Sequence, residues 1–144
     1  MEWLNMWKRF LRLFVRWRLP KPPKPPVEPE PVTTHSDLLD EINRVRAQHS
    51  SRPLAWSSCL VGQAMEHCIQ MGIKGQLSHS GFADRLNVCD VWSGSENVAY
   101  GQRTVEDVVA DWMASPAHKA NLLGDWTTCG AEGVDGYWCA IFAV

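Results

Sequence analysis

Apolar side chains recur every three or four residues in three stretches of the chain, and this period predicts three amphipathic helices. The first begins near Ser36, the second runs from about Ser57 to Gly72, and the third begins after Thr104. His67 lies on the inner face of the second helix, so we expect it to be a partly buried packing residue. The apolar faces are Leu38, Leu39, Ile42 and Val45; Leu60, Ala64, Cys68 and Met71; and Val105, Val108, Val109 and Trp112.

Signals for helix starts and stops agree with these positions. Thr34 and Thr104 each precede an Asp by three residues, which is the spacing of a capping box. Gly75 follows the second helix and favours its termination. Ser115 followed by Pro116 predicts a further short helix, because Ser caps helices and Pro suits the first helical position.

The end of the chain has the pattern of a hairpin. Residues 127–144 read as two strands that turn near Asp135 and Gly136. The second strand is nearly all apolar, so it should be buried in a sheet. Residues 76–96 show no period and are expected to be irregular. Helices that cover a small antiparallel sheet define an α+β domain.

The first 19 residues combine aromatic side chains with basic residues. The aromatic residues at helical spacing are Trp3, Trp7, Phe10, Phe14 and Trp17. Five Lys or Arg residues between Lys8 and Arg18 make a spanning helix costly, and a cleaved signal peptide needs an uninterrupted apolar run. Residues 1–19 therefore favour a basic amphipathic helix at a membrane interface. A degenerate signal or signal-anchor, and a leader or partner-binding helix, stay open.

Residues 20–35 form a predicted linker. Its first part, residues 20–31, holds seven of the nine prolines. Proline lacks a backbone N–H and has a fixed φ, so this stretch cannot be a helix or an inner strand. We expect an extended spacer that rises about 3.1 Å per residue. Its P-x-x-P patterns would also suit an SH3-type domain.

Charge divides the chain into two parts. Residues 1–26 contain seven basic residues and one acidic residue, whereas the remainder contains seven basic and 15 acidic residues. An acidic body is a poor binder of nucleic acid, so no nucleic-acid partner is expected. The basic arm suits anionic head groups, which makes a membrane surface the expected partner of residues 1–19.

The chain has five cysteines, so at least one is unpaired in a monomer. The absence of a C-x-x-C pattern argues against a zinc ribbon or a thioredoxin motif. Cys129 and Cys139 lie on opposite arms of the predicted hairpin, which leaves a cross-strand disulfide open. Cys59, Cys68 and Cys89 are interpreted as ordinary buried thiols.

Seven segments follow one another in the order of a known family: LLDEINRVRA, PLAW, AMEHCIQM, LSHSGFADR, SENVAYG, DWMASPAHKANLL and GYWCAIFAV. Residues 36–144 thereby resemble the CAP (SCP) superfamily, which includes cysteine-rich secretory proteins, antigen 5 and plant pathogenesis-related proteins. The similarity is to the compact bacterial branch. The resemblance implies an α-β-α sandwich with a central cleft, built on a small and mostly antiparallel sheet.

Members of this family often carry two His and two Glu in that cleft, where they can bind a divalent metal. By motif, LSHSGF supplies His79, SENVAYG supplies Glu96 and PAHKANLL supplies His118. The resemblance thus implies His79 and His118 as candidate ligands of a metal such as zinc, with Glu96 as the candidate catalytic base. Ser115 stands where the family's W-x-x-E pattern has its second Glu, which argues against a two-carboxylate mechanism.

Three further residues complete the predicted cleft. Asn97 and Tyr100 follow Glu96 and are expected to line it, although Asn97 would equally suit a turn. Ser115 and His118 lie three residues apart, as a Ser–His pair on one helical face would. The position of Ser115 before a proline is better explained by an N-cap, in which its oxygen accepts from backbone N–H groups.

Two functions from different classes agree with these residues. The favoured one is a binding module that presents the cleft to a lipid, a peptide or a cell-wall fragment. Its basis is the anchor, the spacer and the missing second carboxylate. The alternative is a metal-dependent hydrolase in which Glu96 acts as the base toward water. The domain is expected at the extracellular or periplasmic face, either tethered to a membrane or secreted.

Overall fold

The computed structural model describes residues 35–144, so the predictions for residues 1–34 lie outside the described residues. The described helices are α2 (His35–Gln48), α3 (Ser58–Lys74), α4 (Phe82–Val88), α5 (Val105–Ala114) and α6 (Pro116–Leu123). The described strands are β1 (Ala55–Trp56), β2 (Gly94–Tyr100), β3 (Thr128–Val134) and β4 (Tyr137–Ala143). The three periodic segments and the short helix after Ser115 are therefore confirmed.

Local capping explains where the longer helices begin and end. The Ser57 hydroxyl accepts from the backbone N–H of Leu60 at the start of α3. Gly75 ends that helix in the left-handed region, at φ 62°, where glycine has no steric penalty. Thr104 caps α5 by accepting from the backbone N–H of Asp107 at 3.1 Å. The predicted cap at Thr34 lies outside the described residues.

The strands form one four-stranded sheet in the order β1-β3-β4-β2. Strands β3 and β4 are the predicted hairpin, and they turn at Asp135 and Gly136, which have φ values of 49° and 79°. Strand β2 pairs antiparallel with β4, and β1 pairs parallel with β3. The sheet is therefore mostly antiparallel, and β2 lies at one of its edges.

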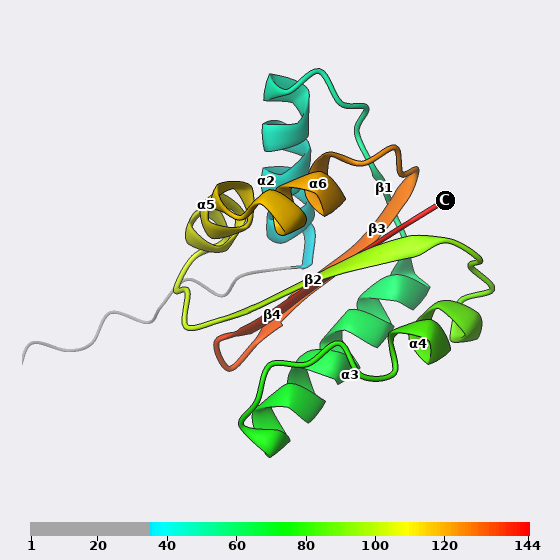
Figure 1. Cartoon of the computed structure of the whole chain (residues 1–144), viewed down its shortest axis with the longest axis vertical. Helices are drawn as coiled ribbons and strands as arrows, with labels where there is room; N and C mark the ends of the chain where they lie inside the picture. The colour runs from blue at the N-terminus through cyan, green and yellow to red at the C-terminus, as the bar shows by residue number, and fades with distance from the viewer. Residues whose placement is uncertain (1–34) are drawn as a thin grey trace, which may run out of the picture. The chain divides into compact units, whose positions relative to one another are not determined.

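Helices cover both faces of this sheet (Figure 1). Helices α2, α5 and α6 lie against one face, and α3 and α4 lie against the other. Strand β4 contributes alternate side chains to the two cores, as the pleat of a strand requires. Trp138, Ala140 and Phe142 pack with the first group of helices, and Tyr137, Cys139, Ile141 and Ala143 pack with the second. This confirms the α-β-α sandwich.

A glycine in β3 lets α3 lie close to the sheet. A Cβ on Gly130 would lie 2.2 Å from the backbone carbonyl carbon of Leu60. Such a distance is far below van der Waals contact, so only glycine permits this approach. The close approach brings the inner face of α3, with His67, over the strands that carry the site.

The interpretation of residues 76–96 as irregular is wrong in part. Helix α4 occupies Phe82–Val88, and β2 begins at Gly94. Helix α4 has seven residues, which is too short to give a clear helical period. It begins at Gly81, which has φ 74° and no side chain to act as a cap. The sequence therefore carries little local signal for this helix.

The cysteines pair differently from the arrangement left open above. Cys59 and Cys89 form a disulfide across 30 residues, which joins the start of α3 to the end of α4. Cys129 lies opposite Phe142 in the hairpin, and its side chain and that of Cys139 point to opposite faces. Cys68, Cys129 and Cys139 are buried free thiols, and burial raises the pKa of each.

Candidate functional site

Glu96 lies at the centre of the candidate site. It is the third residue of the edge strand β2, and it is 5% exposed. Successive side chains of a strand point to opposite faces, so Glu96 and Asn97 enter different layers. Glu96 faces the layer of α3 and α4, where its Oε2 lies 3.7 Å from the Cys139 Sγ. A carboxylate buried in this position needs strong partners.

Arg85 of α4 supplies one of these partners. Its Nε and Nη2 donate to Glu96 Oε2 at 3.0 and 2.6 Å, and its Nη1 donates to the Ser80 carbonyl at 2.8 Å. The side chains of Arg85 and Glu96 are 10% and 2% exposed. Charge-assisted bonds of this kind are about twice as strong as neutral ones. The ion pair therefore fixes both the carboxylate and the loop that carries His79.

His79 contacts the other oxygen of the same carboxylate. Its Nδ1 lies 2.9 Å from Glu96 Oε1, while its side chain is 56% exposed. A carboxylate accepts hydrogen bonds, so Nδ1 is the nitrogen that carries the proton. In the neutral ring Nε2 is then an acceptor. Glu96 thus orients the imidazole of His79 while the ring itself stays open to solvent.

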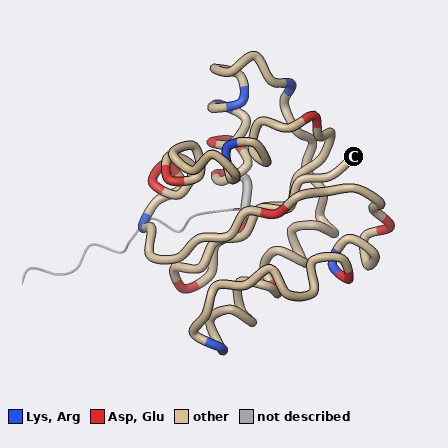
Figure 2. Tube along the Cα trace, in the orientation of Figure 1, with Lys and Arg blue, Asp and Glu red and all other residues tan. Residues whose placement is uncertain are grey.

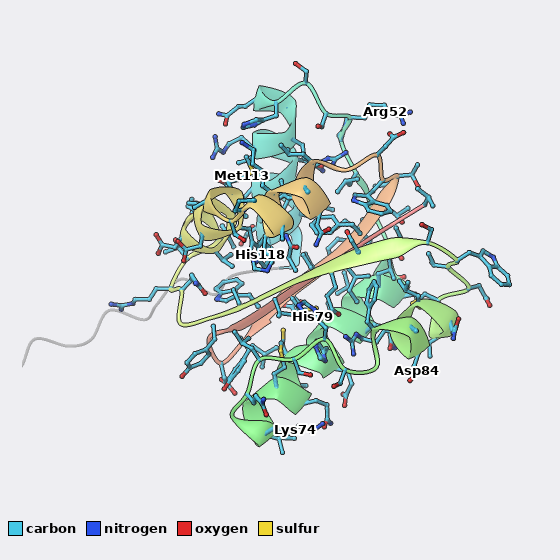
Figure 3. The ribbon with its side chains drawn as sticks, in the orientation of Figure 1. Arg52, Lys74, His79, Asp84, Met113 and His118 are labelled. Carbon is cyan, nitrogen blue, oxygen red and sulfur yellow. A yellow bond between two sulfur atoms is a disulfide. The ribbon has the colours of Figure 1, made fainter. Side chains whose placement is uncertain are left out.

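His118 comes from α6, in the opposite layer of the sandwich. Its backbone carbonyl accepts from Asn97 Nδ2 at 3.0 Å, and Asn97 Oδ1 accepts from Asn121 at 2.9 Å. Figure 3 labels His79 and His118 on the two sides of β2. Burial, and then the nearby His79, lower the pKa of His118. Because β2 is an edge strand, residues of both layers meet here.

Asn97 and Tyr100 take positions that differ from a cleft lining. Asn97 is completely buried, and its bonds hold α6 in place. Tyr100 lies at the far end of β2, where it is 57% exposed and its ring centroid is 4.4 Å from that of Tyr137. Tyr100 is four positions after Glu96 along the strand, which is a separation of about 13 Å. The structure does not bring either side chain to the exposed ring of His79.

Ser115 is the N-cap residue of α6, with Pro116 at the first helical turn. Its hydroxyl makes no capping hydrogen bond, so the expectation that its oxygen is committed to backbone N–H groups is wrong. Ser115 ends α5 as well as beginning α6. Its backbone carbonyl accepts the first hydrogen bond of α6, from the Lys119 N–H at 2.8 Å.

His67 is a member of this network that sequence reasoning missed. It is 6% exposed, and its Nε2 lies 2.6 Å from the Ser78 carbonyl and 3.8 Å from Glu96 Oε1. A carbonyl oxygen accepts, so Nε2 carries the proton. His67 is therefore more than a packing residue, because it holds the 76–80 loop beside the carboxylate. Arg85 was missed as well, since the helix that carries it was not predicted.

The donor set tests whether this site fits a metal. Both oxygens of Glu96 are engaged, one by Arg85 and the other by His79. A zinc site usually has three or four protein ligands, and Glu96 is not free to be one of them. The described residues contain no group of three or more His, Cys, Asp or Glu side chains placed to hold a metal ion. The two candidate ligands, His79 and His118, are therefore fewer than the ligands of a usual zinc site, and Glu96 does not supply a third.

The burial of His67 predicts a pH dependence of stability. Burial lowers the pKa of His67 in the folded protein below the unfolded value of about 6.5. The unfolded chain then binds the proton more readily than the folded protein. The contribution of the neutral His67 ring to the free energy of unfolding is therefore complete above pH 6.5, and it is lost as the pH falls through the folded pKa. Urea unfolding at pH 7.5, 6.5 and 5.5 should show this loss, and His67→Gln should reduce it.

His49→Gln is the matched control, because His49 is exposed at the end of α2. It should leave the pH dependence as it is in the wild type. An equal pH dependence in wild type and His67→Gln would contradict the role given to the buried ring.

Comparison with protein families identifies the class. The model of a family described as CAP, the cysteine-rich secretory protein family, matches residues 39–132. This match covers about two thirds of the chain. The chain belongs to the CAP family. A search of curated proteins finds no match.

Three solved structures share the fold. An extracellular protein containing an SCP domain from Bacillus anthracis str. Ames is 24% identical at a TM-score of 0.72, covering 76% of this chain and 39% of that one. A cysteine-rich secretory protein from Staphylococcus aureus subsp. aureus Mu50 is 22% identical at a TM-score of 0.70, and the match covers 82% of this chain and 40% of that one. An outer surface protein from Borrelia burgdorferi is 24% identical at a TM-score of 0.68, and the match covers 78% of this chain and 95% of that one.

These likenesses show the fold, and they show that it occurs in bacterial proteins described as extracellular or outer-surface. The match spans about two fifths of the length of the first two proteins.

Proposed function

We propose that this chain is an extracellular or surface CAP domain that binds the peptide part of a cell-wall fragment at His79 and His118. The observation that carries this proposal is the buried carboxylate of Glu96, held by Arg85 on one oxygen and holding His79 with the other. This arrangement makes Glu96 a positioning residue. It fixes an exposed imidazole in one orientation before any ligand arrives.

The chemistry of the two rings suits a peptide. With Nδ1 bonded to Glu96, the neutral ring of His79 offers Nε2 to a donor such as a peptide N–H. Burial keeps the neighbouring His118 neutral to lower pH, so it too can exchange hydrogen bonds with amides. A preorganised ring loses little freedom on binding, which favours affinity. A lipid would need an apolar surface, whereas these two rings offer polar atoms.

Location is part of the same proposal. The related structures are extracellular or outer-surface proteins, and the Cys59–Cys89 disulfide suits an oxidising compartment. None of the described helices is both long and apolar enough to cross a membrane. Lys and Arg residues are scattered over several described elements (Figure 2), which is consistent with the prediction of no nucleic-acid partner.

Calorimetric titration with a cell-wall stem pentapeptide, free of sugar, tests the binding proposal. Wild-type chain should bind it in the presence of a chelator, and His79→Ala/His118→Ala should weaken binding at least about tenfold. His49→Ala is the control, because His49 is an exposed histidine away from the site. Binding that requires added zinc would favour the metal-dependent alternative. Equal binding by wild type and the double variant would contradict the proposal.

Residues 1–19 are proposed to tether the domain to a membrane surface. Their basic and aromatic composition supports this, because such helices bind anionic interfaces. Flotation with vesicles of anionic phospholipid should carry the full chain upward, and a chain that starts at Thr33 should stay behind. Equal flotation of both chains would contradict the tether.

A further inference from the structure

A cavity lies beside the Glu96 network. It has a volume of about 150 Å³ and lies between α3 and the segment from Gln76 to Arg85. His79, Glu96 and His118 do not line it. His67 and Arg85 do, and each of them also contacts Glu96 or lies beside it. The cavity is therefore a different surface from the one used in the proposed function.

Five of the ten side chains that line this cavity both donate and accept hydrogen bonds. It contains one apolar side chain, Met71. Amides supply an oxygen acceptor and two N–H donors each, and hydroxyls supply both as well. These groups are the side chains of Gln63, Gln70, Gln76, Ser78 and Ser80.

The charges of the wall balance one another. Glu66 and Lys74 are the two exposed charges, and they have opposite sign. The Arg85 guanidinium is matched by Glu96 behind it. Burial lowers the pKa of His67, which favours its neutral form. A wall without net charge suits an uncharged ligand better than an anion or a cation.

Two of the lining side chains are rigid and nine-tenths buried. Arg85 is 8% exposed and His67 is 6% exposed. Arg85 uses three of its five N–H donors on Glu96 and Ser80, so two remain. The Nε2 of His67 is bound to Ser78, which leaves Nδ1 as an acceptor in the neutral ring. Two buried side chains that line the cavity thus keep hydrogen-bonding capacity beyond their partners within the protein.

We infer that this cavity binds one uncharged, polyhydroxylated ring, such as a single sugar unit. An apolar cavity of about 150 Å³ can hold a six-membered ring, and the amide and hydroxyl side chains of this wall favour hydroxyl and amide groups on that ring. Such groups can replace the hydrogen bonds of the water that they displace. This inference does not rest on the proposed function, because different residues and a different ligand are involved.

Saturation-transfer NMR of the full chain with N-acetylglucosamine tests the inference. Protein saturation should reach the sugar protons in the wild type, and it should fall at least about fivefold in Gln63→Leu/Gln70→Leu. The matched control is Gln48→Leu, because Gln48 is exposed at the end of α2. It should leave the transfer unchanged. Addition of the sugar should also shift the ring nitrogen signals of His67 in the wild type.

Three outcomes would overturn the inference. One is an absence of saturation transfer to N-acetylglucosamine from folded wild-type chain. Another is equal transfer in the wild type and in Gln63→Leu/Gln70→Leu. The third is sugar binding to the wild type that leaves the His67 ring nitrogen signals unshifted. This measurement uses wild-type chain alone, so it decides the question even if the double variant does not fold. Failure of the pentapeptide to bind at His79 would leave this inference standing, so the two proposals fail separately.

Discussion

Arg85→Met is expected to lower the free energy of unfolding by about 3–5 kcal/mol. The substitution leaves Glu96 as a buried carboxylate without its counter-charge, and breaking a buried pair from one side has a cost of this size. Many domains have a total stability of about 5–15 kcal/mol, so the variant should be markedly less stable. Urea unfolding followed by circular dichroism measures the difference.

Two further variants separate the ion pair from a general effect of losing an arginine. Arg44→Met removes an exposed Arg that pairs with Glu41 on α2, and it should change stability little. Arg85→Met/Glu96→Leu replaces both partners by apolar groups and should regain much of the lost stability. A loss in Arg85→Met no greater than that in Arg44→Met would contradict the role of the buried pair.

Cys59→Ala/Cys89→Ala is expected to lower the free energy of unfolding by about 3–4 kcal/mol. The disulfide closes a loop with a sequence separation of 30 residues, and loop-closure entropy gives this magnitude. The cross-link joins the start of α3 to the end of α4, so it also restrains the helices that carry His67 and Arg85. Chemical unfolding with and without reductant measures the effect.

Reductant provides the internal control for this second prediction. It should lower the unfolding midpoint of the wild type and leave that of the double variant unchanged, since Cys68, Cys129 and Cys139 are free thiols. A wild-type midpoint that does not respond to reductant would show that the cross-link does not stabilise the domain.

Much of the fold could be predicted from local patterns. The faces around Leu60 and Val108 have a clear helical period and occur in helices, and the turn at Asp135 and Gly136 occurs as predicted. Helix α4 was missed because seven residues after a glycine give neither a period nor a side-chain cap. The cysteine pairing was missed because it depends on where the end of α4 lies in space, close to the start of α3.

The candidate site could be predicted only in part. Motif order pointed to His79 and Glu96, and these two side chains are in contact. Arg85 and His67 could not be assigned, since their roles depend on how α4 and α3 lie over β2. No pattern in the sequence reports that packing. Asn97 shows the same limit, because the alternation of β2 sends its side chain to the opposite layer from Glu96.

The position of Arg85 changes how Glu96 can act. A carboxylate that accepts from a guanidinium on one oxygen and from an imidazole on the other is a poor ligand for a metal. It is well placed to fix the tautomer and orientation of a histidine, as carboxylates do for histidines in many functional sites. In the proposed function Glu96 therefore acts through His79, and His79 is the residue proposed to meet the ligand.

The tautomer of His79 tests this role of Glu96 most directly. Long-range proton–nitrogen NMR spectra of the full chain, recorded where the ring is neutral, distinguish a proton on Nδ1 from one on Nε2. Wild type should show the proton on Nδ1, and Arg85→Met/Glu96→Leu should shift the ring toward the Nε2 form. A wild-type ring that carries its proton mainly on Nε2 would contradict the positioning of His79 by Glu96.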